Sequence, residues 1–170
     1  FVEILLTRSS ALTADTSFEW EEFAHSINSQ LLANFGNLFQ RLIGLTSTRY
    51  STERFPKPVL NERWKGFYEQ AWKLLAEYTT AMENVQLRRG LEKALELSSL
   101  GNKWMQDWKP WSKEMVANGQ ANETVAILLC YLRLLLAVME PFIPGLTTKA
   151  CALLKLEFPD RLTCFQASSA

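Results

Sequence analysis

Apolar side chains recur every three or four positions along most of the chain, and no segment has the strict alternation of a half-buried strand. This spacing is typical of α-helices that bury one face. The links between the periodic segments are mostly short, which favours antiparallel neighbours. We therefore expect an all-α fold, an antiparallel helix bundle of about five main helices.

Capping residues and breakers give approximate ends for these helices. Ser17 and Gly44 should open and close the first helix, and Asn61 should cap the second. The segment 45–60, with two prolines, is predicted to be a long connection, and residues 77–84 a short break. The expected helices run from about Trp20 to Ile43, Asn61 to Tyr78, Ala81 to Trp108, Glu123 to Glu140 and Leu146 to Leu156.

The stretch "WMQDWKPW" holds three of the six tryptophans of the chain. Trp104 and Trp108 share one helical face, as core residues do. Pro110 should end this helix near Trp108, and a short helical turn should begin at Ser112 and end near Gly119. Trp111 would then lie at the bend, either as a packing staple or as an exposed aromatic platform.

Glycine at position 101 lies inside the third predicted helix. Glycine costs about 1 kcal/mol relative to alanine in a helix interior, so its presence there indicates a close helix contact or a slight kink.

Size and composition describe one ordinary globular domain. The chain has 170 residues, of which 48% are hydrophobic, enough for a substantial core. Its longest purely apolar run, 125–132, is much shorter than a membrane span, so we expect a buried helix and no membrane partner. Three cysteines without a CxxC pair indicate reduced thiols in a cytosolic type of compartment.

Charge and motifs argue against several function classes. Eighteen basic residues balance 18 acidic ones, so the net charge does not indicate a nucleic-acid partner, and any such function must depend on local residues. The sequence has no glycine-rich phosphate loop, no HExxH motif and a single histidine, His25. We therefore expect no catalytic residue, no metal site and no cofactor within this chain.

A polar strip runs along the first predicted helix, where Asn34, Asn37 and Arg41 recur at i, i+3 and i+7. Asparagine is unfavourable inside helices because its amide competes for backbone hydrogen bonds. Its repetition in this helix indicates that the side-chain amides form hydrogen bonds of their own. Asparagine and arginine can pair with base edges, and tryptophan can stack on a base. The alternative is that the asparagines bond neighbouring helices and Arg41 pairs with a surface carboxylate.

Four segments resemble the methionyl-tRNA synthetase family, in the order in which they occur there. "INSQLLANFGNLFQRLI" is similar to its Asn-x-x-Leu-x-x-x-x-Gly-Asn-Leu-x-x-Arg helix, and "GNKWMQDWKPW" to its Asn-Lys-aromatic segment that ends in Pro-Trp. "FVEILLTRSSALTADTSFEWEEF" resembles the join between the catalytic and helical domains, and "MEPFIPGLTTKACALL" the Pro-Phe-x-Pro helix start. Together they cover residues from about 4 to 156.

The sequence also departs from the family pattern. "RSS" stands where Arg-Pro-Glu is usual, Asn34-Phe35 replaces the commoner Asn-Leu, and Gln106 occupies a position that is often acidic. The ATP-site signatures His-Ile-Gly-His and Lys-Met-Ser-Lys-Ser do not occur in the sequence. We therefore expect a fragment that follows the catalytic domain of a longer ligase.

The resemblance implies a helical domain of the class Ia synthetase anticodon-binding type, which recognises the CAU anticodon of methionine tRNA. By matching position, Asn37 and Arg41 would read anticodon bases and Trp111 would stack on one, while Trp104 and Trp108 would pack and position the bend. Supporting contacts would come from the remaining polar candidates: Asn34, Lys103, Gln106, Lys109 and Lys113.

The same resemblance implies an organisation and a parent enzyme. Residues 1–18 would form a junction from the catalytic domain, 19–157 the helical domain and 158–170 a C-terminal tail. The parent would be a methionine tRNA ligase that uses ATP and L-methionine, located in the cytoplasm, with a mitochondrial parent as the alternative. Two other functions remain open: a helical protein-interaction module with tryptophan anchors, and a stand-alone tRNA-binding factor.

Overall fold

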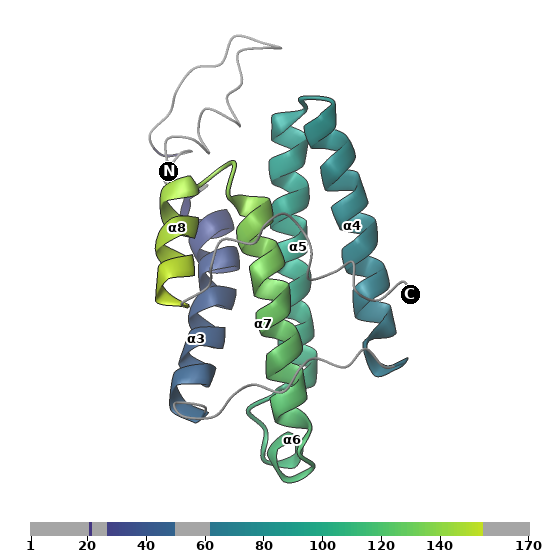
Figure 1. Cartoon of the computed structure of the whole chain (residues 1–170), viewed down its shortest axis with the longest axis vertical. Helices are drawn as coiled ribbons and strands as arrows, with labels where there is room; N and C mark the ends of the chain where they lie inside the picture. Colours follow the sequence, from purple (N-terminus) through teal and green to yellow (C-terminus); the bar gives the residue numbers. More distant parts are fainter. Residues whose placement is uncertain (1–20, 22–26, 50–61, 155–170) are drawn as a thin grey trace.

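The computed structural model describes residues 21, 27–49 and 62–154, and within these ranges the chain is helical apart from short links (Figure 1). The all-α prediction is confirmed. The elements, in chain order, are a π-helix η1 (Ile27–Gly36), α3 (Asn37–Arg49), a 3-10 turn η2 (Glu62–Trp64), α4 (Lys65–Glu83), α5 (Leu87–Trp108), α6 (Lys113–Ala117), α7 (Gln120–Met139) and α8 (Pro144–Leu153).

Several sequence predictions fall outside the described residues. These are the junction 1–18 and the tail 158–170, the caps Ser17 and Asn61, and the side chains His25 and Cys164.

The helices that pack against α5 do not all run antiparallel to it. The Trp64 indole donates to Glu123 Oε1 at 3.3 Å, and the Trp64 and Trp108 rings are in edge contact. The starts of α4 and α7 therefore meet the end of α5, so both helices are antiparallel to α5. In contrast, η1 and α3 run parallel to α5, because their residues 34, 37 and 41 bond to residues progressively later along it. This parallel pair departs from the prediction.

Gly44 does not end the first helix, because α3 continues through it to Arg49. The last turns are supported by side-chain hydroxyls: Thr46 Oγ1 donates to the Ile43 carbonyl at 2.9 Å, and Ser47 Oγ to that of Gly44 at 3.2 Å. These local bonds offset the low helix propensity of the segment. The predicted long connection is therefore helical up to residue 49.

The break predicted at residues 77–84 is also wrong, because α4 runs through Glu83. Its two threonines are accommodated by bonds one turn back, from Thr79 Oγ1 to the Leu75 carbonyl and from Thr80 Oγ1 to that of Ala76, both at 2.9 Å. The turn is shorter and later than predicted: it includes Val85 at φ 57°, and α5 begins at Leu87.

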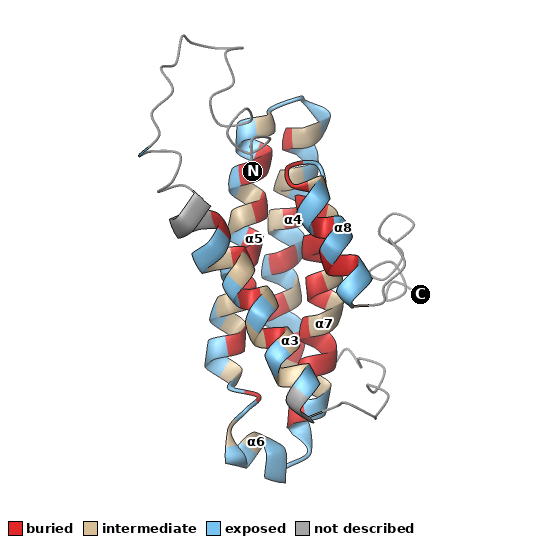
Figure 2. Ribbon diagram, turned by 90° about the vertical axis from the view of Figure 1, so that its left-hand side faces the viewer, coloured by how far each residue is buried: buried red, intermediate tan, exposed pale blue. Residues whose placement is uncertain are grey.

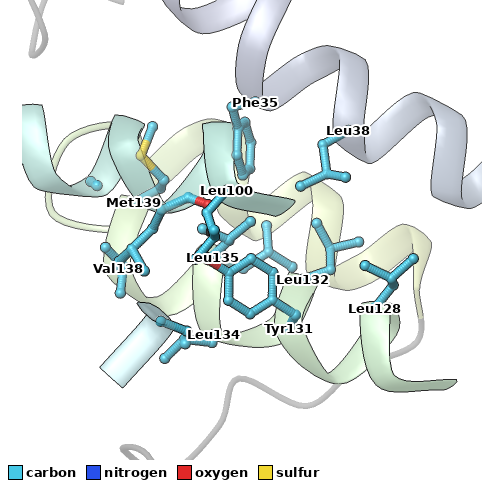
Figure 3. Close-up of a cluster of buried hydrophobic side chains, with 14 of the residues drawn as sticks. Phe35, Leu38, Leu100, Leu128, Tyr131, Leu132, Leu134, Leu135, Val138 and Met139 are labelled. Carbon is cyan, nitrogen blue, oxygen red and sulfur yellow. Dashed lines mark hydrogen bonds between the residues drawn. The ribbon is translucent and has the colours of Figure 1, made fainter. Parts of the chain in front are cut away.

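Helix α7 is the central core helix, as predicted, although it begins at Gln120 and ends at Met139. It is long and apolar enough to cross a membrane, but 67% of its most apolar window is buried in the bundle, which identifies it as a core helix. Figure 3 shows its side chains Tyr131, Leu132 and Leu135 among Phe35 and Leu38 from the first helical segment and Leu100 from α5.

Within the described ranges, the cysteines agree with the sequence prediction, whereas the start of the last helix differs from it by two residues. Cys130 is half-buried, Cys151 is buried, and neither forms a disulfide. Helix α8 begins at Pro144, two residues before the predicted start, because proline at the first helical position needs no hydrogen-bond partner for its nitrogen.

The glycine at position 101 marks a close helix contact, one of the two outcomes expected from the sequence. A Cβ atom at Gly101 would lie 2.7 Å from Leu38 Cδ2 and 2.9 Å from Tyr131 Cε1. Only a residue without a side chain lets α3 and α7 approach α5 this closely. Figure 2 shows the buried faces of these helices turned inward and the mostly exposed α6 at one end of the bundle.

Candidate nucleic-acid interface

The polar strip of the first helical segment lies along α5. Because the two segments run parallel, their helical repeats coincide, and each residue of the strip meets the α5 residue 65 positions later. The three bonds are Asn34 Nδ2 to Ser99 Oγ at 2.8 Å, Asn37 Nδ2 to Asn102 Oδ1 at 3.2 Å and Arg41 Nη2 to Gln106 Oε1 at 3.0 Å. We call these six residues the polar ladder.

Asn34 is engaged in helix packing. Its Nδ2 also donates to the Leu95 carbonyl at 3.0 Å, and both its backbone oxygen and its Oδ1 accept from Asn102 Nδ2, at 2.8 and 3.1 Å. The side chain is half-buried. The alternative in which the asparagines bond a neighbouring helix therefore holds for Asn34, and Asn37 also bonds α5 through Asn102. Arg41 bonds the amide of Gln106, whereas the alternative expected a carboxylate partner.

Arg41 brings the strip to the predicted aromatic platform. Its guanidinium carbon lies 5.0 Å from the centroid of the Trp111 ring, within the range of a cation–π contact. Asn37 is exposed one helical turn before Arg41, and Trp111 keeps 37% of its surface exposed. The structure thus groups Asn37, Arg41 and Trp111 on one surface, although they come from two distant parts of the sequence.

The bend after α5 holds Trp111 at this surface. Helix α5 ends at Trp108, as Pro110 predicts, and Lys109 adopts a left-handed conformation with φ 43°. The Ser112 amide then bonds to the Lys109 carbonyl at 2.8 Å, and Ser112 Oγ caps α6 by accepting from the Met115 amide at 3.3 Å. Trp111 therefore lies between a closed turn and a helix cap.

Trp104 and Trp108 are packing residues, as expected. Their rings lie 4.7 Å apart, centroid to centroid, and Trp104 is 5.4 Å from the fully buried ring of Phe67. Burial also raises the pKa of Tyr131, whose ring lies 4.7 Å from Phe67 and whose hydroxyl donates to the Leu97 carbonyl at 2.8 Å. This neutral aromatic cluster supports the bend from inside.

The predicted supporting residues have different positions. Gln106 is exposed and holds Arg41, whereas an acidic residue there would form an ion pair. Lys103, Lys109 and Lys113 are exposed around the end of α5 and the start of α6, close to Trp111 along the chain. They add positive charge near Asn37, Arg41 and Trp111 but do not take part in the contacts that hold those three side chains.

Asn102 is the site residue that the sequence reasoning missed. It joins Asn34 to Asn37 and is half-buried between the two helices. A signal was available: Ser99, Asn102 and Gln106 repeat the i, i+3, i+7 spacing of the strip on a second helix. Within the described ranges, no group of three or more histidine, cysteine or carboxylate side chains could hold a metal ion.

Comparison with known protein families gives two matches, one for each part of the chain that contributes to this site. The model described as the anticodon binding domain of methionyl tRNA ligase matches residues 60–163, and the model for class I tRNA synthetases (M) matches residues 3–43. This chain belongs to the methionyl-tRNA ligase family. Residues 60–163, which include α4 to α8, match its anticodon-binding domain.

Individual relatives agree with this assignment. The chain is 34% identical to a probable cytoplasmic methionine–tRNA ligase of Dictyostelium discoideum over 85% of its length, and 32% identical to one of Schizosaccharomyces pombe over 84%. It spans only 20% and 19% of those two proteins. The fold matches Mycobacterium tuberculosis methionyl-tRNA synthetase in its free state with a TM-score of 0.78, at 21% identity, covering 92% of this chain and 32% of that one.

Proposed function

We propose that this domain recognises the CAU anticodon of methionine tRNA, with Asn37 and Arg41 reading bases and Trp111 stacking on one of them. The observation that carries the proposal is the grouping of these three side chains on one surface at the end of α5. An amide, a guanidinium and an indole supply hydrogen-bonding edges and a stacking face, which are the means by which proteins read unpaired RNA bases.

Arg41 is held loosely enough to take part. A cation–π contact at an exposed site contributes about 0.5–1 kcal/mol, and only this contact is lost when a base takes that face of the Trp111 ring. The hydrogen bond from the charged guanidinium to Gln106 can be kept. Stacking a base on an aromatic ring contributes about 1–3 kcal/mol. A base can therefore displace the guanidinium from the Trp111 ring, or use the opposite face, without a large cost, and the released Arg41 can bind the base or its phosphate.

The domain alone should bind tRNA weakly. Its 18 basic and 18 acidic residues give no net attraction for the phosphate backbone, which usually dominates RNA affinity. Phosphate contacts from Lys103, Lys109 and Lys113 would supply part of that attraction. The remainder would come from the catalytic domain of the full protein.

The whole protein is proposed to be a methionine tRNA ligase that joins L-methionine to its tRNA at the expense of ATP. The relatives named above carry that activity in their names, and they are about four times as long as this chain. ATP and methionine would bind in the catalytic domain, and this domain would contribute tRNA selection. We propose a cytoplasmic location, because those relatives are described as cytoplasmic and neither Cys130 nor Cys151 forms a disulfide.

The test is binding of the chain, at a stated low salt concentration, to an anticodon hairpin with CAU and to one with the first base changed. We expect a preference for CAU of about tenfold or more that is lost in Trp111→Ala. Trp72→Ala is the matched control, since Trp72 is 45% exposed on α4, outside the proposed site. Equal binding of both hairpins by wild type would overturn the proposal and favour a protein-interaction module.

A further inference from the structure

The amide of Asn102 has one defined orientation in the polar ladder. Its nitrogen donates to the backbone carbonyl of Asn34 at 2.8 Å and lies 3.3 Å from that of Ser98. A backbone carbonyl only accepts hydrogen bonds, so the side facing these two atoms must be the Nδ2 side. The Oδ1 atom of Asn102 must then face the other way, toward Asn37.

Asn34 reinforces the same orientation. Its own Nδ2 is directed to the Leu95 carbonyl at 3.0 Å, so its Oδ1 is the atom that meets Asn102 Nδ2 at 3.1 Å. Rotating the Asn102 amide by 180° would place an oxygen against three acceptors and remove the side-chain donor from the Asn34 and Ser98 carbonyls. Backbone atoms of two helices therefore determine the polarity of the asparagine contacts in the ladder.

The orientation of the Asn102 amide also determines that of the Asn37 amide. Because Asn102 Oδ1 accepts, the contact at 3.2 Å requires Asn37 to donate one of its N–H groups. The exposed amide of Asn37 then presents its Oδ1 atom and its second N–H to a ligand. Without Asn102, the two ends of this exposed amide would be free to exchange places.

We propose that Asn102 is a positioning residue for specificity: it orients Asn37 so that Asn37 Oδ1 accepts from an exocyclic amino group of an anticodon base. This inference deepens the proposed function and rests on it. Cytosine and adenine carry such amino groups, whereas uracil and guanine carry a carbonyl oxygen at the corresponding position. An oriented acceptor therefore favours C over U and A over G, the first two bases of CAU.

The test compares hairpins with CAU, UAU and CGU, each change replacing one amino group with a carbonyl. The quantity measured is the ratio of affinities, CAU over UAU and CAU over CGU. Asn102→Ala should lower at least one ratio by about fivefold or more. The matched control is Ser99→Ala, which removes another α5 partner of Asn34 but not the bond to Asn37, and should leave both ratios within about twofold.

A double-mutant cycle distinguishes positioning from general damage to the fold. In the Asn37→Ala background, Asn102→Ala should change neither ratio, because there is no amide left to orient. The proposal is overturned if Asn102→Ala weakens all three hairpins equally, or if it lowers the ratios as much without Asn37. If Asn102→Ala does not fold, Asn102→Ser, too short to reach Asn37, takes its place.

A second measurement does not depend on RNA. In a 15N-labelled protein, the side-chain amide protons of Asn37 should shift in Asn102→Ala and keep their wild-type positions in Ser99→Ala. Unshifted protons in Asn102→Ala would refute the positioning role whatever the RNA results. If wild type binds the three hairpins equally while the protons shift as expected, the anticodon assignment fails and only the internal orientation of Asn37 stands.

Discussion

Replacing Gly101 with alanine adds one methyl group where α3, α5 and α7 meet. The new carbon would lie 2.7 Å from Leu38 Cδ2 and 2.9 Å from Tyr131 Cε1, well inside the 3.5–4.0 Å of a favourable carbon contact. Leu38 can move by changing its rotamer. Tyr131 has less freedom, because its hydroxyl is bonded to the Leu97 carbonyl at 2.8 Å.

Two opposing terms give the size of the effect. Alanine is favoured over glycine in a helix by about 1 kcal/mol, whereas overpacking a core typically costs about 1–3 kcal/mol. We expect the packing term to be at the upper end, because Tyr131 must either keep the clash or lose its hydrogen bond. The expected net result is a loss of about 1–2 kcal/mol in the free energy of unfolding.

Gly44, on α3, supplies the matched control for Gly101 on the neighbouring α5. It lies inside α3, it is exposed, and a Cβ atom there would meet no other group within 4 Å. Gly44→Ala should therefore stabilise the protein by up to about 1 kcal/mol. Urea unfolding of the two variants should separate their free energies of unfolding by about 1–3 kcal/mol. A Gly101→Ala protein as stable as Gly44→Ala would show that α3 and α7 do not approach α5 as closely as described.

Three further predictions concern the core, alkaline pH and the bend. Tyr131→Phe keeps the ring but leaves the Leu97 carbonyl without its extra donor, so urea unfolding should show a loss of about 1 kcal/mol, and an unchanged value would mean that the bond is not formed. Burial, with a smaller contribution from Glu140, raises the pKa of Tyr78 to about 12 from its ordinary 10.0. The folded state therefore holds this proton more tightly, and the resulting stability should persist below pH 10 and fall as the pH rises towards 12. The fall should be smaller in Tyr78→Phe, in which Tyr68 and Tyr131, whose pKa values are also raised by burial, still titrate. Ser112→Ala removes the cap of α6, at a local cost of about 1 kcal/mol, and should speed hydrogen exchange of the Met115 amide, while unchanged exchange would argue against the cap.

Local signals in the sequence predicted the parts of the fold that depend on nearby residues. Proline at 110 ended α5 at Trp108, and α6 opens after Ser112, where the sequence predicted the start of a helical turn. The errors arose where weak local preferences were overridden. At Gly44 and at Thr79 and Thr80 the helix continues, because hydroxyl bonds and burial of the neighbouring apolar residues outweigh a few tenths of a kcal/mol of propensity per residue.

The sequence by itself determined that the chain is helical, that it has one strongly buried helix, and that Asn34, Asn37 and Arg41 share a face, because each of these follows from the 3.6-residue period. Only the tertiary structure decided what that face does. The parallel register of η1 and α3 with α5 assigns Asn34 to packing, leaves Asn37 exposed, and brings Arg41 to Trp111. That register depends on close contacts between helices, such as those around Gly101, which no local window of the sequence contains.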